Sequence, residues 1–79
     1  MAGDDVLDAV RSCAVEVLQV RPESITLDAV FTDDLGASSL TIVEVVMALE
    51  EIFGFQAPEG DVSSIRTVAN ACDLVRRLS

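Results

Sequence analysis

Apolar residues recur at three- and four-residue steps in three segments, and this spacing constrains the fold more than any other feature of the sequence. The first of these stripes consists of Val6, Leu7, Val10, Ala14, Val17 and Leu18. Because such spacing gathers side chains on one face of a helix, it predicts a helix from about Asp5 to Val20. Pro22 prevents that helix from continuing.

The second helix is predicted from Ser39 to Phe53, where good helix formers dominate and Gly54 supplies a stop. The side chains expected to face the core are Leu40, Val43, Met47 and Leu49.

The third stripe predicts a helix at the C-terminal end, with Thr67 as its N-cap. Its apolar members are Val68, Ala69, Cys72, Val75 and Leu78. The preceding segment, Pro58 to Ile65, contains Gly60 and has room for a turn or two of weak helix.

The stretch from Glu23 to Ser38 has no sustained period and is predicted to be a long loop. The side chains expected to pin it to the core are Ile25, Leu27, Val30, Phe31 and Leu35.

The sequence contains no alternation of apolar and polar residues that would predict a strand. The fold class is therefore all-α, a small antiparallel bundle of three main helices and one short one, and 79 residues suffice for a single domain, 1–79.

The net charge of −9 is concentrated in the middle of the chain. Pro22 to Ile65 contains nine acids and no base, whereas the remainder has five of each. This field disfavours nucleic acid and anionic membrane surfaces as partners and favours proteins with a basic patch. The sequence shows neither a membrane-spanning apolar run nor a secretory signal, so we expect a soluble, cytoplasmic protein. We also expect a monomer.

Cys13 and Cys72 form no CxxC pair, and the chain has no histidine, so metal-ligand spacing is absent. Two buried thiols are expected, with a disulfide between neighbouring helices as the lesser alternative. Without histidine no Ser-His-acid triad can form. We expect the chain not to be an enzyme and to have no catalytic residue.

A glycine-containing loop, Asp34 to Ser38, leads directly into the second helix. A helix N-terminus has unpaired N–H groups and favours an attached anion. Ser38 is the expected N-cap, which leaves the Ser39 hydroxyl free for modification. A serine pair in isolation more often only caps and solvates a helix, so the flanking sequence has to decide.

The run Asp34-Leu35-Gly36-Ala37-Ser38-Ser39-Leu40, followed by Val43 to Glu51 and Phe53, resembles the attachment site and second helix of discrete, type II acyl carrier proteins. The similarity extends through Pro58, Ile65, Thr67 and Val68 and covers essentially the whole chain. It implies that a phosphopantetheinyl transferase attaches 4'-phosphopantetheine to Ser39 and that the thiol of this arm holds acyl groups as thioesters. In the family the motif is Asp-Ser-Leu, whereas this chain has Ser38 at the aspartate position. Capping survives this exchange, whereas recognition by the usual transferase or by generic fatty acid synthase partners is what the missing charge puts in question.

The second helix presents an acidic stripe of Thr41, Glu44, Ala48 and Glu51, with Glu50 beside it. Such glutamates usually form only a solvated face. The resemblance instead implies a docking surface, formed by Glu44, Glu50 and Glu51 with Leu40. The expected partners are a ketosynthase, acyltransferase, reductase or other acyl-processing enzyme with a basic patch.

A set of apolar residues is predicted to form the core first of all, and the resemblance adds a second use for it as a shelter for the acyl chain. These residues are Val43, Met47, Leu49, Phe53, Ile65 and Val68.

Three functions compete. The first is a carrier for fatty acid or polyketide synthesis, where Ser38 and the arginine-only set of bases favour a specialised pathway. The second is a peptidyl or aminoacyl carrier, disfavoured because the loop lacks the Gly-Gly-x-Ser pattern. The third is an acidic interaction module without a prosthetic group; its calcium-binding version is disfavoured because Asp33 to Ser38 lacks the required alternating oxygen ligands.

Overall fold

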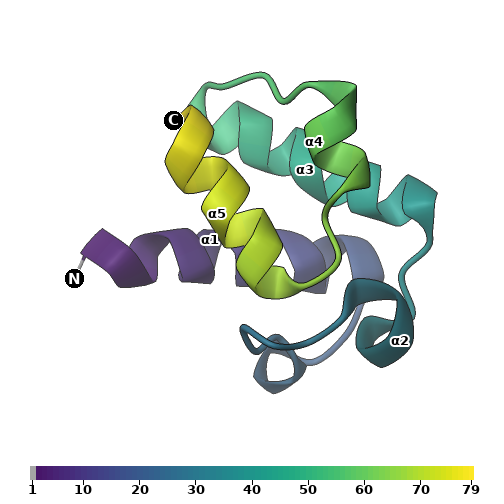
Figure 1. Cartoon of the computed structure of the whole chain (residues 1–79). Coiled ribbons are helices and arrows are strands. Elements are labelled where there is room, and N and C mark those ends of the chain that lie inside the picture. The colour runs from purple at the N-terminus through teal and green to yellow at the C-terminus, as the bar shows by residue number, and fades with distance from the viewer. Residues whose placement is uncertain (1) are drawn as a thin grey trace.

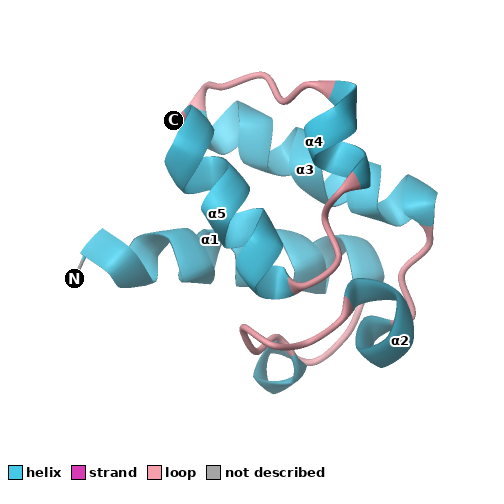
Figure 2. Cartoon of the chain, in the orientation of Figure 1, coloured by secondary structure: helices cyan, strands magenta, loops and turns pink. Residues whose placement is uncertain are grey.

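The computed structural model describes residues 2–79, and within them the chain forms five α-helices and one 3-10 turn (Figures 1 and 2). The elements are α1 (Ala2–Leu18), η1 (Pro22–Ser24), α2 (Phe31–Leu35), α3 (Ser39–Phe53), α4 (Glu59–Ser63) and α5 (Val68–Leu78). The described part of the chain contains no strand, only an isolated bridge between Val30 and Thr67. The predicted all-α fold is confirmed.

The three long helices pack against one another. Helix α3 returns along α1 in the opposite direction, and α5 lies across both (Figure 1). The short α4 packs on α3, while η1 and α2 belong to the connector that leads from α1 to α3 (Figure 2). The start of α3 therefore lies where the connector ends.

The core is aliphatic apart from one aromatic side chain, Phe31, which is 1% exposed. Its largest fully buried members also include Val10, Ile25, Leu49 and Leu74. No polar or charged residue is buried among the described residues. The fold is therefore held mainly by burial of apolar surface, which contributes about 25 cal/mol for each Å² removed from water.

The helix boundaries follow local signals. Helix α1 ends at Leu18, earlier than the predicted Val20, because Gln19 adopts a left-handed backbone with a φ of 57°. The predicted bounds of α3 are confirmed, with Gly54 as its left-handed C-cap. Thr67 is the N-cap of α5, as predicted, in a capping box with Asn70.

The prediction of a structureless loop from Glu23 to Ser38 is wrong. Residues Phe31–Leu35 form α2, which buries Phe31 and Leu35. A five-residue helix is too short to show a repeating apolar period, so the sequence pattern did not reveal it. Ile25 is buried as expected, but Leu27 is 49% exposed.

Backbone hydrogen bonds fasten this connector to the segment that begins α5. The N–H of Phe31 donates to the carbonyl of Arg66 at 3.0 Å, and the N–H of Val68 donates to the carbonyl of Ala29 at 3.0 Å. These bonds join segments far apart in the sequence, so α5 and the connector hold each other in place.

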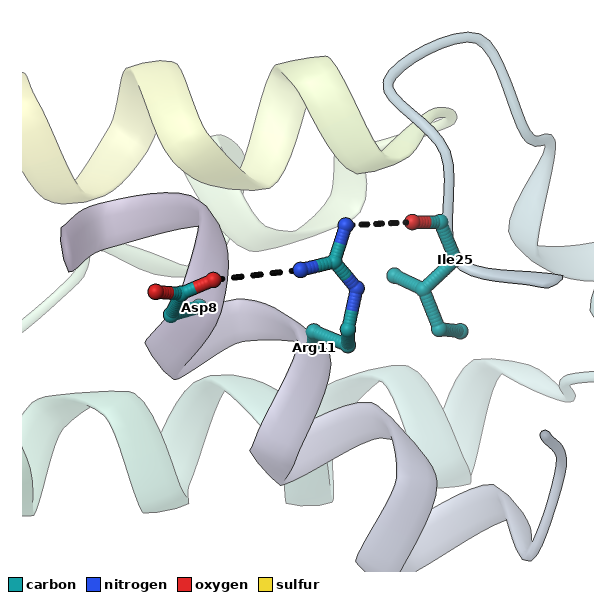
Figure 3. Close-up of polar contacts among 3 residues, drawn as sticks. All are labelled: Asp8, Arg11 and Ile25. Carbon is teal, nitrogen blue, oxygen red and sulfur yellow. Dashed lines mark hydrogen bonds and ion pairs between the residues drawn. The ribbon is translucent and has the colours of Figure 1, made fainter. Parts of the chain in front are cut away.

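Arg11 ties the connector to α1 as well (Figure 3). One guanidinium nitrogen lies 3.1 Å from an Asp8 carboxylate oxygen on the same helix, and the other donates to the carbonyl of Ile25 at 3.3 Å. The side chain thereby satisfies a backbone carbonyl that belongs to no helix.

Helix α3 turns a different face to the core from the one predicted. Its buried residues are Ile42, Val45, Val46 and Leu49. Of the four predicted, Leu49 alone is buried, while Leu40, Val43 and Met47 are 68%, 39% and 57% exposed. Because α3 is apolar on most of its circumference, two stripes compete for the core, and only packing against α1 and α5 selects between them.

We expect position 36 to require glycine because of its left-handed backbone conformation and not because a side chain would clash there. Its φ is 68°, and a Cβ at this position meets no atom within 4 Å. The substitution Gly36→Ala should therefore lower the free energy of unfolding by about 1 kcal/mol through left-handed strain. Gly60 lies in α4 and has no positive φ. The substitution Gly60→Ala should therefore not lower the free energy of unfolding. Urea unfolding followed by circular dichroism compares the two, and equal effects would contradict this account.

Candidate functional site

The loop before α3 is built by the residues of the Asp34 to Ser38 run. The carboxylate of Asp34 accepts a hydrogen bond from the N–H of Val30 at 2.8 Å, which closes the first turn of α2. Leu35 is buried, and Gly36 ends α2 in the left-handed region. The N–H of Ala37 then donates back to the carbonyl of Phe31 at 2.8 Å. The run thus fixes where α3 begins.

Ser38 is the N-cap of α3, as predicted. Its hydroxyl accepts from the N–H of Thr41 at 3.3 Å, and the Thr41 hydroxyl accepts from the N–H of Ser38 at 2.8 Å. These reciprocal bonds form a capping box in which threonine replaces the more usual Glu or Gln. The Ser38 oxygen is therefore engaged with the backbone.

Ser39, the first residue of α3, is exposed. Within residues 2–79 its hydroxyl has no hydrogen-bond partner, and the N–H groups of Ser39 and Leu40 have no acceptor. These free donors and the helix dipole suit an anionic group bound at this hydroxyl. A phosphodiester on Ser39 fits the site, since it supplies acceptors and no further donor.

The exposed face of α3 combines apolar and acidic side chains. Leu40, Val43 and Met47 lie along one line of the helix, with the exposed carboxylates of Glu44 and Glu51 beside them. We call these five residues the α3 ridge. An apolar strip bordered by charge of one sign is typical of a protein-binding surface.

Glu50 differs from the other two predicted docking glutamates. It is half-buried, and its carboxylate accepts a hydrogen bond from the N–H of Ala57 at 2.7 Å. This bond secures the loop between α3 and α4. Among the described residues, the Glu50 carboxylate therefore makes a hydrogen bond to the backbone, whereas the carboxylates of Glu44 and Glu51 make none.

A groove of about 600 Å³ lies between α2, α3 and α4 and is lined by Ser39. Its apolar lining is Ile42, Val43, Val62 and Ile65, and its polar lining includes Thr32, Glu59 and Ser63. Of the predicted pocket residues, Val43 and Ile65 line this groove. Leu49 and Val68 are buried in the core, Phe53 packs against the core, and Met47 borders a separate hollow on α3. Sequence reasoning missed Ile42 and Val62; their only signal is that they are apolar.

The two cysteines are buried and free, as expected. Burial raises the pKa of the Cys13 thiol, and Glu16 adds to that rise; burial is also the main cause that raises the pKa of Cys72. Both thiols therefore stay protonated at neutral pH and are poor nucleophiles. Among residues 5–79, whose side chains the structure describes, no cluster suited to a metal ion occurs.

Comparison with known proteins agrees with this geometry. The family described as "Phosphopantetheine attachment site" matches residues 8–75. The chain is also 40% identical over 75 residues to an acyl carrier protein of Petrotoga mobilis, an alignment that covers 95% of this chain and 88% of the relative. No described helix is long and apolar enough to cross a membrane.

The capping role of Ser38 can be measured. Ser38→Ala removes the acceptor for the N–H of Thr41 and should lower the free energy of unfolding by about 1 kcal/mol. Ser38→Asp should keep wild-type stability, because aspartate caps equally well and its charge suits the helix dipole. Urea unfolding of the three proteins tests this; an alanine variant as stable as the aspartate variant would refute the capping role.

Proposed function

The chain belongs to the acyl carrier protein family, and we propose that Ser39 is the residue to which its 4'-phosphopantetheine is attached. Members of this family are carriers rather than enzymes. The covalent 4'-phosphopantetheine supplies a thiol that holds an acyl group as a thioester. Phosphopantetheinyl transferase and acyl-processing enzymes are accordingly the classes of protein with which a carrier interacts.

The observation that carries the assignment is the contrast between two adjacent serines. Ser38 is occupied by the capping box, whereas Ser39 is exposed at the first position of α3 with an unengaged hydroxyl. Free N–H groups beside Ser39 favour the phosphodiester electrostatically by roughly 0.3 to 1 kcal/mol. Both the chemistry of the site and its accessibility to a transferase therefore favour Ser39.

The chain itself lacks the groups needed to activate this serine. The sequence has no histidine, and both cysteine thiols are buried with raised pKa values. In this proposal a transferase supplies both the general base and the phosphopantetheine donor. In this proposal the chain contributes the nucleophilic hydroxyl, an exposed position and a rigid helix.

The α3 ridge is our proposed docking surface for the transferase and for acyl-processing enzymes. Its carboxylates, Glu44 and Glu51, border the apolar side chains of Leu40, Val43 and Met47 and share the base-free segment with Ser39. Opposite charge on a partner accelerates encounter, and apolar contact then holds the complex. We expect Glu50 to contribute less, since its carboxylate already binds the loop to α4.

We further propose that residues 1–79 act as one carrier domain that presents acyl intermediates of polyketide or fatty acid biosynthesis. One apolar core, to which all three long helices contribute, supports a single domain. The groove beside Ser39 offers shelter for an acyl chain, with Ile42 and Val62 joining the predicted Val43 and Ile65. Shelter of this kind limits hydrolysis of a thioester by excluding water.

Mass spectrometry tests the attachment site. When the chain is coexpressed with a broad-specificity phosphopantetheinyl transferase, the intact mass should show one phosphopantetheine adduct. Ser39→Ala should lose the adduct completely, whereas Ser38→Ala, the matched control, should keep it on Ser39. An adduct that persists in Ser39→Ala, or that maps to Ser38, contradicts the assignment.

Charge reversal tests the docking surface. The double variant E44K/E51K should lower the kcat/KM of the transferase about tenfold at low ionic strength, because attraction to a basic patch becomes repulsion. The deficit should shrink at high salt. The control E16K/E23K makes the same charge change on α1 and η1, where both glutamates are exposed. Equal losses in both double variants would show that net charge, not the α3 ridge, governs recognition.

A further inference from the structure

A second pocket, lined in part by Arg66, shares four lining residues with the groove beside Ser39. This second pocket has a volume of about 510 Å³ and shares Thr32, Ile42, Ser63 and Ile65 with the first. Because four residues line both, the two pockets adjoin each other, and we call them together the path. The path begins at Ser39 and reaches the first base after the acidic segment.

The chemical character of the path changes along its length. The part near Ser39 is lined by Val43 and Val62, with Glu59 and Gly60 beside them. In the second pocket these residues no longer contribute, and Asp33, Ser64 and Arg66 line it instead, together with Val30. A chain that enters from Ser39 thus meets apolar side chains first and mostly polar ones afterwards.

Most of the donors along this path are already engaged. The hydroxyl of Ser63 donates to the carbonyl of Gly60 at 3.1 Å, and that of Ser64 donates to the carbonyl of Asp61 at 2.9 Å. The hydroxyl of Thr32 lies 3.4 Å from a carboxylate oxygen of Asp33. Arg66, in contrast, is exposed, and its guanidinium has no hydrogen-bond or ion-pair partner among residues 5–79, whose side chains the structure describes. It offers five N–H donors.

The charges on the path decide which acceptor suits these donors. Asp33 lines the same pocket as Arg66, and Glu59 lies toward the Ser39 end. Because acids outnumber the single base, a carboxylate on the bound chain would be repelled as well as attracted. A neutral carbonyl oxygen accepts from a guanidinium without that repulsion.

We propose that this path binds an acyl chain that carries a keto oxygen several atoms from the thioester, with Arg66 as the residue that selects it. The inference rests on the proposed attachment at Ser39 and names the class of cargo. A fully reduced alkyl chain can use the apolar part of the path but leaves Arg66 without a partner. Oxygenated intermediates of the polyketide type are therefore favoured over those of fatty acid synthesis.

The experiment starts from the apo protein, whose Ser39 hydroxyl is free, and compares acyl groups of equal length and different oxygen content. Octanoyl, 7-oxooctanoyl and 7-carboxyheptanoyl groups are attached to the intact protein from their phosphopantetheine donors, and intact mass establishes that each is loaded. The readouts are the ¹H-¹⁵N shifts of Ser63, Ser64 and Arg66 and the rate of thioester cleavage by hydroxylamine. The keto chain should shift these signals most and be cleaved about threefold to tenfold more slowly than octanoyl, the effect of one additional hydrogen bond.

Arg66→Met keeps an unbranched side chain but shortens it and removes its donors, so it should abolish the difference between keto and alkyl chains. Arg21→Met makes the same charge change at an exposed position outside the path and should preserve the difference. Equal behaviour of keto and alkyl chains in the wild type, a difference that survives Arg66→Met, or the strongest effect from the carboxylate chain would each overturn the proposal. Failure to load any chain on Ser39 would instead overturn the proposed attachment site.

Discussion

The position of the candidate attachment site depends on the bonding of the long connector to the start of α5. Hydrogen bonds from Phe31 to Arg66 and from Val68 to Ala29 join these segments, and the Phe31 side chain is buried beneath them. Burial of a side chain of this size contributes about 1.5 to 3 kcal/mol. With the connector fixed, α2 ends at Gly36 and α3 begins at a defined place. The exposure of Ser39 thus depends on contacts made by other segments of the chain.

Helix α3 has a buried face and an exposed face of different character. Its buried stripe of Ile42, Val45, Val46 and Leu49 joins the core, while the α3 ridge is left at the surface. Exposed apolar side chains such as Leu40 and Met47 lower solubility, and the neighbouring carboxylates offset this by keeping the surface charged. The same carboxylates repel anionic surfaces, which is consistent with the basic partners proposed for the α3 ridge.

The short helix α4 covers the groove with few stabilising contacts. None of its residues is buried, and Ser63 and Ser64 bond only to carbonyls of the same segment. An ion pair between Asp61 and Arg77, at 3.8 Å, links it to α5, and exposed pairs of this kind contribute little. Segments with few buried contacts open at low cost in free energy. Helix α4 is therefore suited to move when a chain enters the groove, while the three long helices keep their packing.

The sequence alone determined the three long helices, the caps at Ser38, Gly54 and Thr67, and the acidic segment that contains Ser39, because each depends on residues within a few positions of one another. It also determined the family, through the run from Asp34 to Leu40. Packing decided what local pattern leaves open: which apolar stripe of α3 is buried, that Phe31–Leu35 becomes helical, and that Glu50 bonds to Ala57. The groove belongs to this second group, since its walls come from α2, α3 and α4 and exist only after the chain has folded.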